Sequence, residues 1–541
     1  MAREDDSHSP DSGTPTPTGD TAPIVVQSQV HGVSDWHPAS PAEYGETAHA
    51  KEAAAARLRV VNASVGGQSP APPELDAGES KRAFSLDALR GLFLISMTMG
   101  FTISSTHLPV WMYHRQFPFD AEKAVDVAGI SWRDLAYASF LFTMAAALPL
   151  TLSRRIDKGE LEIGIIKAAF KRYALLLVYA LLIGHSNTFI LGYTQSARVL
   201  SVIGFVIMAM IFTRRRSDWN ESRFRVINLT GWVLAIAFLA ITPISYGQTF
   251  SFHRIDDIIA GLAFASLFGS LIWYFTRDNL LPRLAILAMA VAMYLGAKGD
   301  GWLSQFWWDW KFDWAFSAQR FVLFCVIIPG TIVGDVILRW MRSPGEPEVT
   351  PDAWGRGRIG ALTLLCVAFT PVVTVGLFNR NLQMTTALVA VMLIGGGFLT
   401  WGPVRPVERM LRSLYLWAGV WMLIGLFLEP FEGGIHKVPD TLTYFFTITG
   451  TTSMLLVALT ALIDALGRRK WVAVLIDVGH NPLLLYVLFT ILINSLIQLV
   501  PALRDFMMGS VPLEMTRYLV EVLMIVTIVR FMSRKRIYWR T

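Results

Sequence analysis

The sequence predicts an all-α, polytopic membrane protein, a helical bundle that crosses the bilayer about 12–14 times. Two observations indicate this fold class. Of the 541 residues, 53% are hydrophobic and only 16% are charged, whereas soluble domains carry about 25% charged residues. The charged residues are also concentrated between long apolar stretches, as expected for a chain in lipid, where an unpaired ionic group is costly.

The segment 1–80 differs in composition from the rest of the chain. It is rich in Ser, Pro, Thr, Ala and acidic residues, and it has few large apolar residues. Such a segment cannot bury enough apolar surface to offset the entropy lost on ordering. We therefore predict a disordered cytoplasmic arm over residues 1–80 and a transmembrane domain over residues 81–541.

From residue 81 onward, apolar runs long enough to cross about 30 Å of hydrocarbon follow one another with short breaks. The predicted spans are 87–106, 133–152, 173–192, 197–213, 227–244, 256–276, 281–297, 319–340, 359–377, 383–401, 413–429, 442–463, 479–499 and 516–533. The shorter runs, such as 197–213, are also compatible with tilted or re-entrant segments.

The loops between these spans alternate in charge. One set is basic, as in Arg214–Arg216 and Arg468–Lys470, and the other set is aromatic and less basic. Basic loops stay on the cytoplasmic side, so we expect a bacterial inner-membrane protein with both termini in the cytoplasm. We interpret the basic runs as topology signals beside the lipid bilayer and expect no nucleic-acid partner. The Trp cluster at 302–314 is either an interfacial belt or a sugar-stacking platform.

Polar residues near the first two spans are the first candidates for function. Asp87 and Arg90 lie three apart, on one helical face where they can pair, as an anchoring ion pair or as a site for a phosphorylated ligand. His107, His114 and Asp134 lie near the outer ends of these spans. An imidazole beside a carboxylate is the arrangement that general base catalysis needs.

Further polar residues occur within or beside later spans, where burial in lipid makes them functional candidates. Some of them are expected to be interhelical contacts instead. These residues are His185, Asn187, Arg198, Asp335, Lys437, His480, Asn481 and Glu521. The two cysteines, Cys325 and Cys366, lie in apolar segments without metal-ligand spacing, so we predict no metal.

Several strings in the chain resemble a known family. FSLDALRGLFL, WMYHRQFP, GISWRDLAYASFLFTMAAALPLTLSRRI, EGGIHKVPDTLTYFFTITG and DVGHNPLLLYVL are similar to segments of the heparan-α-glucosaminide N-acetyltransferase-like transmembrane acyltransferases. The resemblance is strongest to an uncharacterised bacterial branch, and it extends over residues 81–541.

The resemblance implies a dimeric helical bundle that takes an acyl group from cytoplasmic acyl-CoA, acetyl-CoA above all, and passes it to an amino sugar or other glycan at the opposite face. His114 matches the family's active histidine, with His107 as the weaker match, and Asp134 matches the aspartate that begins the next span. Arg198 and Asn481 match a basic position and a late asparagine. Gly100-Phe101-Thr102 stands where the family's enzymes carry an asparagine.

The implied chemistry needs few groups. A thioester is already activated, so the histidine would serve as a base or as a transient acyl carrier. The phosphates of CoA need cations, for which Arg90, Lys171 and Arg172 are available as charge-assisted partners, and the resemblance makes Arg198 a fourth candidate. Two alternatives remain at this stage. A proton-coupled transporter or flippase would depend on Asp335 or Glu521, and a non-catalytic scaffold would depend on none of these residues.

Overall fold

The computed structural model describes residues 82–102, 110–112, 114–116, 127–191, 194–245, 250–308, 314–343, 352–500, 502 and 510–541. The secondary structure within these residues consists of helices joined by loops. The predicted arm 1–80 and the candidate His107 lie outside these residues. Within them there is no β-strand, and only two isolated β-bridges occur. The predicted all-α class is confirmed.

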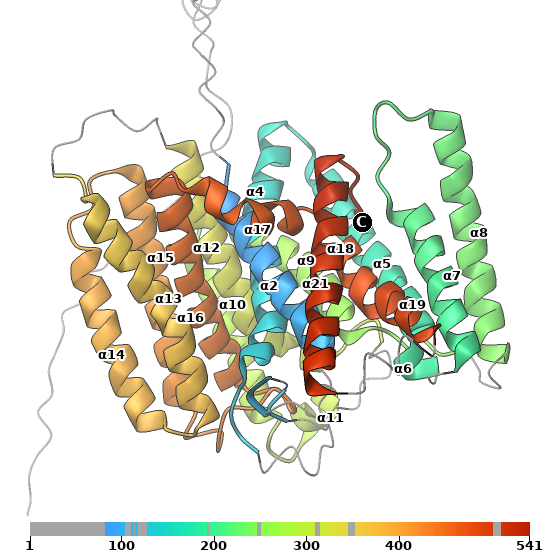
Figure 1. Ribbon diagram of the computed structural model, residues 1–541. Helices are drawn as coiled ribbons and strands as arrows, with labels where there is room; N and C mark the ends of the chain where they lie inside the picture. Colours follow the sequence, from blue (N-terminus) through green and yellow to red (C-terminus); the bar gives the residue numbers. More distant parts are fainter. Residues whose placement is uncertain are drawn as a thin grey trace, which may run out of the picture. The chain divides into compact units, whose positions relative to one another are not determined.

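Nine helical segments in the described ranges are long and apolar enough to cross a membrane. Their helices are α4 (Leu135–Asp157), α7 (Gln195–Phe212), α8 (Glu221–Ser245), α9 (Asp257–Thr276), α12 (Phe324–Arg342), α13 (Arg356–Phe378), α14 (Leu382–Leu399), α15 (Pro406–Leu428) and α16 (Leu442–Thr460). Together they form a polytopic bundle (Figure 1). The chain is thus a multi-pass membrane protein, as predicted.

Four other predicted spans also coincide with helices. They are α2 (Phe84–Thr102), α5 (Glu162–Ser186), α10 (Leu280–Gly296) and α21 (Val511–Arg534). Helix α10 is short, at 17 residues, and α2, α5 and α21 all include charged residues. The predicted count of 12–14 therefore depends on these helices, in addition to the nine that meet the criteria of length and hydropathy.

One predicted span begins at a sharp bend. The helical run that starts with α18 (Pro482–Val487) and extends to Gln498 corresponds to the predicted span 479–499, and α17 (Ala473–Gly479) precedes it as a separate segment. The helical segments on the two sides meet at an angle of 71°. Pro482 explains the break, since a proline lacks the backbone N–H and disfavours helical backbone at the preceding residue.

Helix α2 crosses α17 at two glycines. A Cβ added to Gly91 would lie 1.9 Å from the carbonyl oxygen of Leu475, and one added to Gly479 would lie 1.9 Å from that of Asp87. Small residues permit such close backbone approach between membrane helices. The crossing brings His480, which follows α17, next to the polar residues of α2.

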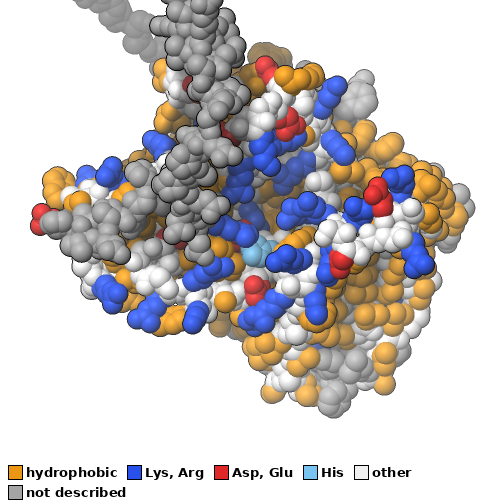
Figure 2. All heavy atoms as spheres, turned by 90° about the horizontal axis from the view of Figure 1, so that it is seen from above, with side chains coloured by type: hydrophobic (Ala, Val, Ile, Leu, Met, Phe, Trp, Pro, Cys, Tyr) orange, Lys and Arg blue, Asp and Glu red, His pale blue; other side chains and the backbone are white. Residues whose placement is uncertain are grey.

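The two ends of the bundle differ in charge. Figure 2, seen from above, shows Lys and Arg side chains gathered on the end at which α2 begins. Helices α4, α12 and α21 contribute arginines in their last turns, and the 3-10 turn η5 (Arg469–Val472) adds two more cations. The opposite end carries α11 (Trp302–Trp308) and the loop between α15 and α16. We call these the basic end and the aromatic end.

Candidate functional site

At the aromatic end, a buried histidine and a buried aspartate are hydrogen-bonded. Nδ1 of His114 pairs with Oδ1 of Asp134, and both side chains are buried. The other carboxylate oxygen, Oδ2, accepts hydrogen bonds from the backbone N–H of Ser131 at 2.8 Å and from its hydroxyl at 3.1 Å. Residues 132–134 form the short 3-10 helix η2 (Trp132–Asp134), which leads into α4. This local turn fixes the carboxylate, and the carboxylate in turn orients the imidazole.

A distant loop joins this pair. Nζ of Lys437 lies 3.5 Å from Nδ1 of His114. The loop that carries Lys437 is tied to the segment before η2, because the backbone N–H of Gly129 donates to the carbonyl of Ile435 at 2.8 Å. Tyr444, at the start of α16, donates its hydroxyl to the Asp134 carbonyl at 2.8 Å. The structure therefore brings three of the predicted candidates, His114, Asp134 and Lys437, to one place.

The surroundings favour a neutral imidazole. Burial and the Lys437 ammonium lower the pKa of His114 to about 4, against the opposing effect of Asp134. Burial also lowers the pKa of Lys437. At neutral pH the His114 ring is uncharged, so it can accept a proton, as a general base must.

A cavity of about 480 Å³ adjoins the pair. Lys437 lines it and so connects it to His114. The wall combines aromatic and charged side chains. They include Tyr294, Trp307, Trp308, Lys298, Glu432, His436, Lys437 and Asp440. We call this the aromatic-end cavity.

A second cavity, of about 640 Å³, lies toward the basic end. Three of the four cations predicted to bind CoA, namely Arg90, Lys171 and Arg172, line it. Arg155, His480 and Arg540 also contribute to the wall, and apolar side chains such as Phe140, Met144 and Leu176 complete it. We call this the basic-end cavity. It gathers cations from α2, α4, α5 and the C-terminal segment.

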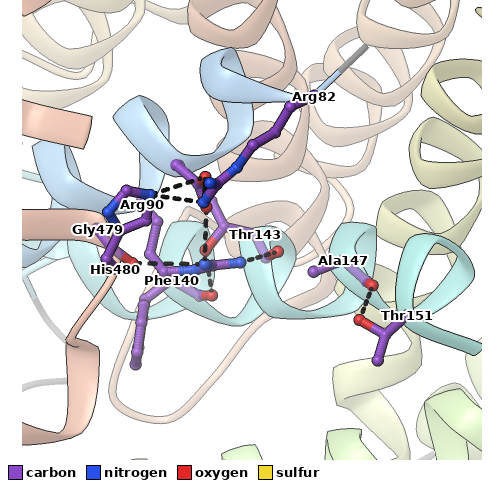
Figure 3. Close-up of polar contacts among 9 residues, drawn as sticks. Arg82, Arg90, Phe140, Thr143, Ala147, Thr151, Gly479 and His480 are labelled. Carbon is purple, nitrogen blue, oxygen red and sulfur yellow. Dashed lines mark hydrogen bonds and ion pairs between the residues drawn. The ribbon is translucent and has the colours of Figure 1, made fainter. Parts of the chain in front are cut away.

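Backbone contacts hold Arg90 at this cavity. Its guanidinium donates to the carbonyls of Thr143, at 3.3 Å, and Gly479, at 3.5 Å (Figure 3). Asp87 lies 3.4 Å from Arg90, 3.3 Å from Arg82 and 3.3 Å from Nε2 of His480. The predicted Asp87–Arg90 ion pair is present, and Arg90 still faces the cavity.

Asn481 has a positioning role. Its Nδ2 donates to the carbonyl of Ile537 at 2.9 Å, and its Oδ1 accepts the backbone N–H of Trp539 at 3.0 Å. The same C-terminal segment forms an isolated bridge between Thr213 and Trp539. These contacts place Arg540 at the wall of the basic-end cavity.

Three other predicted residues line neither cavity. Arg198 donates to Oε1 of Gln195 at 2.9 Å and to the carbonyl of Gln498 at 2.7 Å. It therefore joins α7 to α19 (Asn494–Gln498) and does not line the basic-end cavity with the other predicted cations. His185 hydrogen-bonds the Leu181 carbonyl at 3.0 Å within α5 and stacks on Phe250. Asn187 directly follows the last residue of α5.

Two cations of the basic-end cavity were missed by sequence reasoning. Arg155 lies in a basic run after a predicted span, and nothing in the sequence distinguishes it there from the other basic residues that mark topology. Arg540 follows the last helix by several residues. No local sequence pattern indicates that the chain folds back there and places Arg540 beside α4 and α5. The Ser131-x-x-Asp134 spacing, by contrast, is a recognisable helix-start pattern that could have shown what holds Asp134.

Helix α4 connects the two sites. Asp134 directly precedes its first residue, and Phe140 of the same helix lines the basic-end cavity. Six residues of α-helix rise about 9 Å. Along the axis of α4, Phe140 in the wall of the basic-end cavity is thus about 9 Å from Asp134, which holds His114.

Residues 82–337 match a family described as a domain of unknown function (DUF5009). The match begins just before α2 and ends within α12, so it includes His114, Asp134, Arg90, Lys171 and Arg172. No curated protein matches the chain. Because the family description assigns no activity, the resemblance to the transmembrane acyltransferases remains a prediction.

Proposed function

We propose that the protein is an integral membrane acyltransferase, which moves an acyl group from acyl-CoA in the basic-end cavity to a sugar acceptor at the aromatic end. The observation that carries this proposal is the placement of two different sites along α4. A buried His–Asp pair lies at the start of the helix, and a cation-lined cavity begins about 9 Å along its axis.

The basic-end cavity suits an anionic, partly apolar donor. Arg90, Lys171 and Arg172 offer charge-assisted hydrogen bonds to phosphates. The apolar wall from Phe140 and Met144 suits the pantetheine arm and the acyl group. Its volume, about 640 Å³, falls within the range of about 300–1,000 Å³ that is usual for small-molecule sites.

His114 suits the transfer step. Asp134 accepts a hydrogen bond from Nδ1–H, which fixes the tautomer in which Nε2 is the basic ring nitrogen. In the direct route, Nε2 takes the proton of the acceptor while the acceptor's O or N attacks the thioester carbonyl. The C–S bond then breaks, and the proton passes from Nε2 to the CoA thiolate. In the two-step route, Nε2 itself carries the acyl group between donor and acceptor.

The transporter alternative is less well supported. Asp335, one of the groups that a proton pathway would use, is ion-paired with Arg283 at 2.6 Å and accepts a hydrogen bond from Trp273 at 2.7 Å. Glu521 lies 3.4 Å from Arg517. Asp335 is held by two partners and is poorly placed to exchange protons, so we favour acyl transfer.

The charge asymmetry supports an orientation. Basic residues gather at one end (Figure 2), and the positive-inside rule assigns such an end to the cytoplasm. In a bacterial inner membrane this orientation would open the basic-end cavity toward cytoplasmic acyl-CoA and leave the aromatic end for an envelope sugar.

The test is acyl transfer by the purified protein in nanodiscs. Acetyl-CoA is supplied with and without amino sugars, and free thiol is measured. We expect His114→Ala to lower thiol release about 10²–10⁴-fold, the usual contribution of a general base. His253→Ala, at an exposed histidine, is the matched control and should leave the rate unchanged. Thiol release that is the same in the wild type and in His114→Ala would refute the proposal.

A further inference from the structure

The turn between α13 and α14, residues 377–381, contacts both chain segments that form the histidine site. One segment comprises residues 114–116 and 127–134, and we call it the His–Asp segment. The other is the loop between α15 and α16, which carries Lys437 and which we call the lysine loop. The α13–α14 turn lies beyond residues 82–337, which match the family, so the family match does not include it.

Two contacts join this turn to the His–Asp segment. The guanidinium of Arg115 lies over the ring of Phe378, 4.5 Å from its centroid, in a cation–π contact. Gly129 approaches the end of α13 so closely that a Cβ built on it would lie 3.0 Å from the carbonyl oxygen of Leu377. Its φ of 127° is one that glycine adopts readily and other residues do not. The turn is thus packed against the residue that follows His114 and against the backbone that leads into η2.

Arg380 joins the turn to the lysine loop. Its guanidinium donates to the carboxylate of Glu429, whose side chain is only 4% exposed. It also lies against Gly434, since a Cβ built on that glycine would be 2.9 Å from Nη1 of Arg380. Glu429 directly follows α15, and Lys437 comes three residues after Gly434. Arg380 therefore contacts the loop at its start and again just before the lysine.

The two segments are also joined to each other where they face the turn. The backbone N–H of Gly129 donates to the carbonyl of Ile435 at 2.8 Å, and Ile435 directly follows Gly434. The two glycines that pack against the turn therefore belong to one crossing of the chain. A change in how the turn packs on this crossing would change where Lys437 lies relative to His114.

The backbone of Arg380 indicates that its side chain matters. Its φ is 60°, in the left-handed region, and it stands two residues after Phe378, the last residue of α13. Glycine is the usual residue in this conformation after a helix, and any larger residue is strained there. Glycine would relieve the strain but would lose the ion pair with Glu429. The arginine is therefore explained by its contact with the lysine loop.

We infer that Arg380 is a positioning residue of the histidine site, which holds the lysine loop so that the ammonium of Lys437 stays beside His114. The inference rests on the proposed function only for the reaction that the site performs. The charged groups around the imidazole are Asp134 and Arg133 of the His–Asp segment and Lys437 of the lysine loop. Local hydrogen bonds within the His–Asp segment hold Asp134, so loss of the Arg380 contact should displace Lys437 above all.

The ionisation of His114 in the full-length protein, without acyl-CoA, tests this inference. Histidine labelled with carbon-13 is followed by NMR as the pH is lowered from about 8 to about 4, and the resonance of His114 is the one missing from His114→Ala. We expect the pKa of His114 to rise by about one unit in Arg380→Gly, a tenfold change in the ionisation constant, because the ammonium moves away. An unchanged pKa would overturn the inference.

The matched control is Arg536→Gly. Arg536 also follows a helix with a left-handed backbone, at a φ of 58°, but its side chain is exposed. Its replacement should leave the pKa of His114 as in the wild type. Arg380→Lys, which keeps the charge, should retain part of the effect of the arginine.

A double variant tests whether Arg380 acts through the lysine. Lys437→Met alone should raise the pKa of His114, and adding Arg380→Gly should raise it no further, since the charge to be positioned is already absent. Additive shifts would refute the positioning role. If Arg380→Gly does not fold, Glu429→Gln weakens the same ion pair from its other side and should shift the pKa in the same direction. No shift in that folded variant would equally overturn the inference.

This inference and the proposed function can fail separately. The titration needs neither acyl-CoA nor turnover. If thiol release depends on His114 while its pKa does not respond to Arg380→Gly, the inference is wrong and the acyltransferase proposal stands. If the pKa responds as expected but no thiol is released, Arg380 positions the site and the site serves another reaction.

Discussion

The backbone N–H of Trp539 donates to Oδ1 of Asn481 at 3.0 Å, while Nδ2 of the same asparagine donates to the carbonyl of Ile537 at 2.9 Å. Asn481 lies at the break between α17 and α18. One side chain thus connects the broken helix to the C-terminal segment, and this segment supplies Arg540 to the basic-end cavity. The family resemblance suggested a site residue here, and the contacts indicate a positioning residue.

Replacing Asn481 with alanine should release the C-terminal segment. The change leaves the buried N–H of Trp539 without a partner, at a cost of about 1–3 kcal/mol, and also removes the donor to the partly buried carbonyl of Ile537. Hydrogen–deuterium exchange over residues 535–541 should rise, and affinity for acyl-CoA should fall because Arg540 is no longer held. Asn481→Asp, which keeps the acceptor and loses the donor, should be intermediate. Wild-type exchange in Asn481→Ala would show that other contacts hold the segment.

The helical fold could be predicted because each membrane-spanning helix is encoded by one continuous hydrophobic run in the sequence. The run 133–152 corresponds to α4, and 442–463 corresponds to α16 with the π-helical turn η4 (Ala461–Ala465) that follows it. The break at Pro482 could also have been expected from the proline itself. The bend was not predicted, because hydropathy averaged over a window does not register one residue that interrupts backbone hydrogen bonding.

The sites were predictable only in part. Arg90, Lys171 and Arg172 line one cavity, and their proximity could be expected because all three belong to the basic ends of neighbouring spans. The contact of Lys437 with His114 joins residues 323 apart in the sequence, and no periodic pattern reports such a distance. Arg198 was placed with the CoA cations by resemblance, but it hydrogen-bonds the Gln498 carbonyl instead.

The stability of the folded protein should depend on pH through His114. Burial and the nearby ammonium lower the pKa of the folded protein's His114 to about 4, from 6.5. The unfolded chain therefore binds a proton between pH 6.5 and 4 that the folded chain does not. Stability should fall as the pH drops through this window, by up to about 3 kcal/mol in total. Melting temperatures of the wild type and His114→Ala between pH 7 and 4 measure this difference.

Lys437→Met should raise the pKa of His114, because the repulsive charge is removed while Asp134 remains. If His114 is the base, the acid limb of the pH–rate profile for acyl-CoA cleavage reports this pKa. The limb should move to higher pH in Lys437→Met. Lys298→Met is the control, since that lysine is paired with Glu432 and should leave the limb in place. An unmoved limb in Lys437→Met would contradict the electrostatic coupling.

The cations of the basic-end cavity should bind the phosphates of CoA. Arg172→Gln removes a charge that lines the cavity, and a lost charge-assisted contact should weaken acyl-CoA binding about 10–100-fold. An S-acyl pantetheine, which lacks the nucleotide phosphates, should bind the variant and the wild type equally. Lys158→Gln, at an exposed residue of the same end, is the control. Equal losses for both ligands would indicate a packing defect instead.

The Arg283–Asp335 pair should act in stability and not in proton transfer. Arg283 is 1% exposed and also donates to the hydroxyl and the carbonyl of Thr276, at 3.1 and 3.2 Å. Removing Arg283 leaves the carboxylate of Asp335, which is 25% exposed, without its charge partner, so we expect a cost somewhat below the roughly 3–5 kcal/mol of a fully buried pair. Arg283→Leu should therefore lower the melting temperature strongly, and adding Asp335→Leu should restore part of the loss.

A proton-coupled transporter predicts the opposite result for the same pair. In that case Asp335→Asn would abolish function while the protein stays folded, because the substitution preserves shape and removes only the titratable group. We expect instead that Asp335→Asn lowers stability and leaves the rate of acyl-CoA cleavage per folded molecule unchanged. Asp278→Asn, at a surface acid beside Arg277, should change neither quantity, since exposed pairs contribute about 0–1 kcal/mol. Normal stability combined with lost activity in Asp335→Asn would favour the transporter.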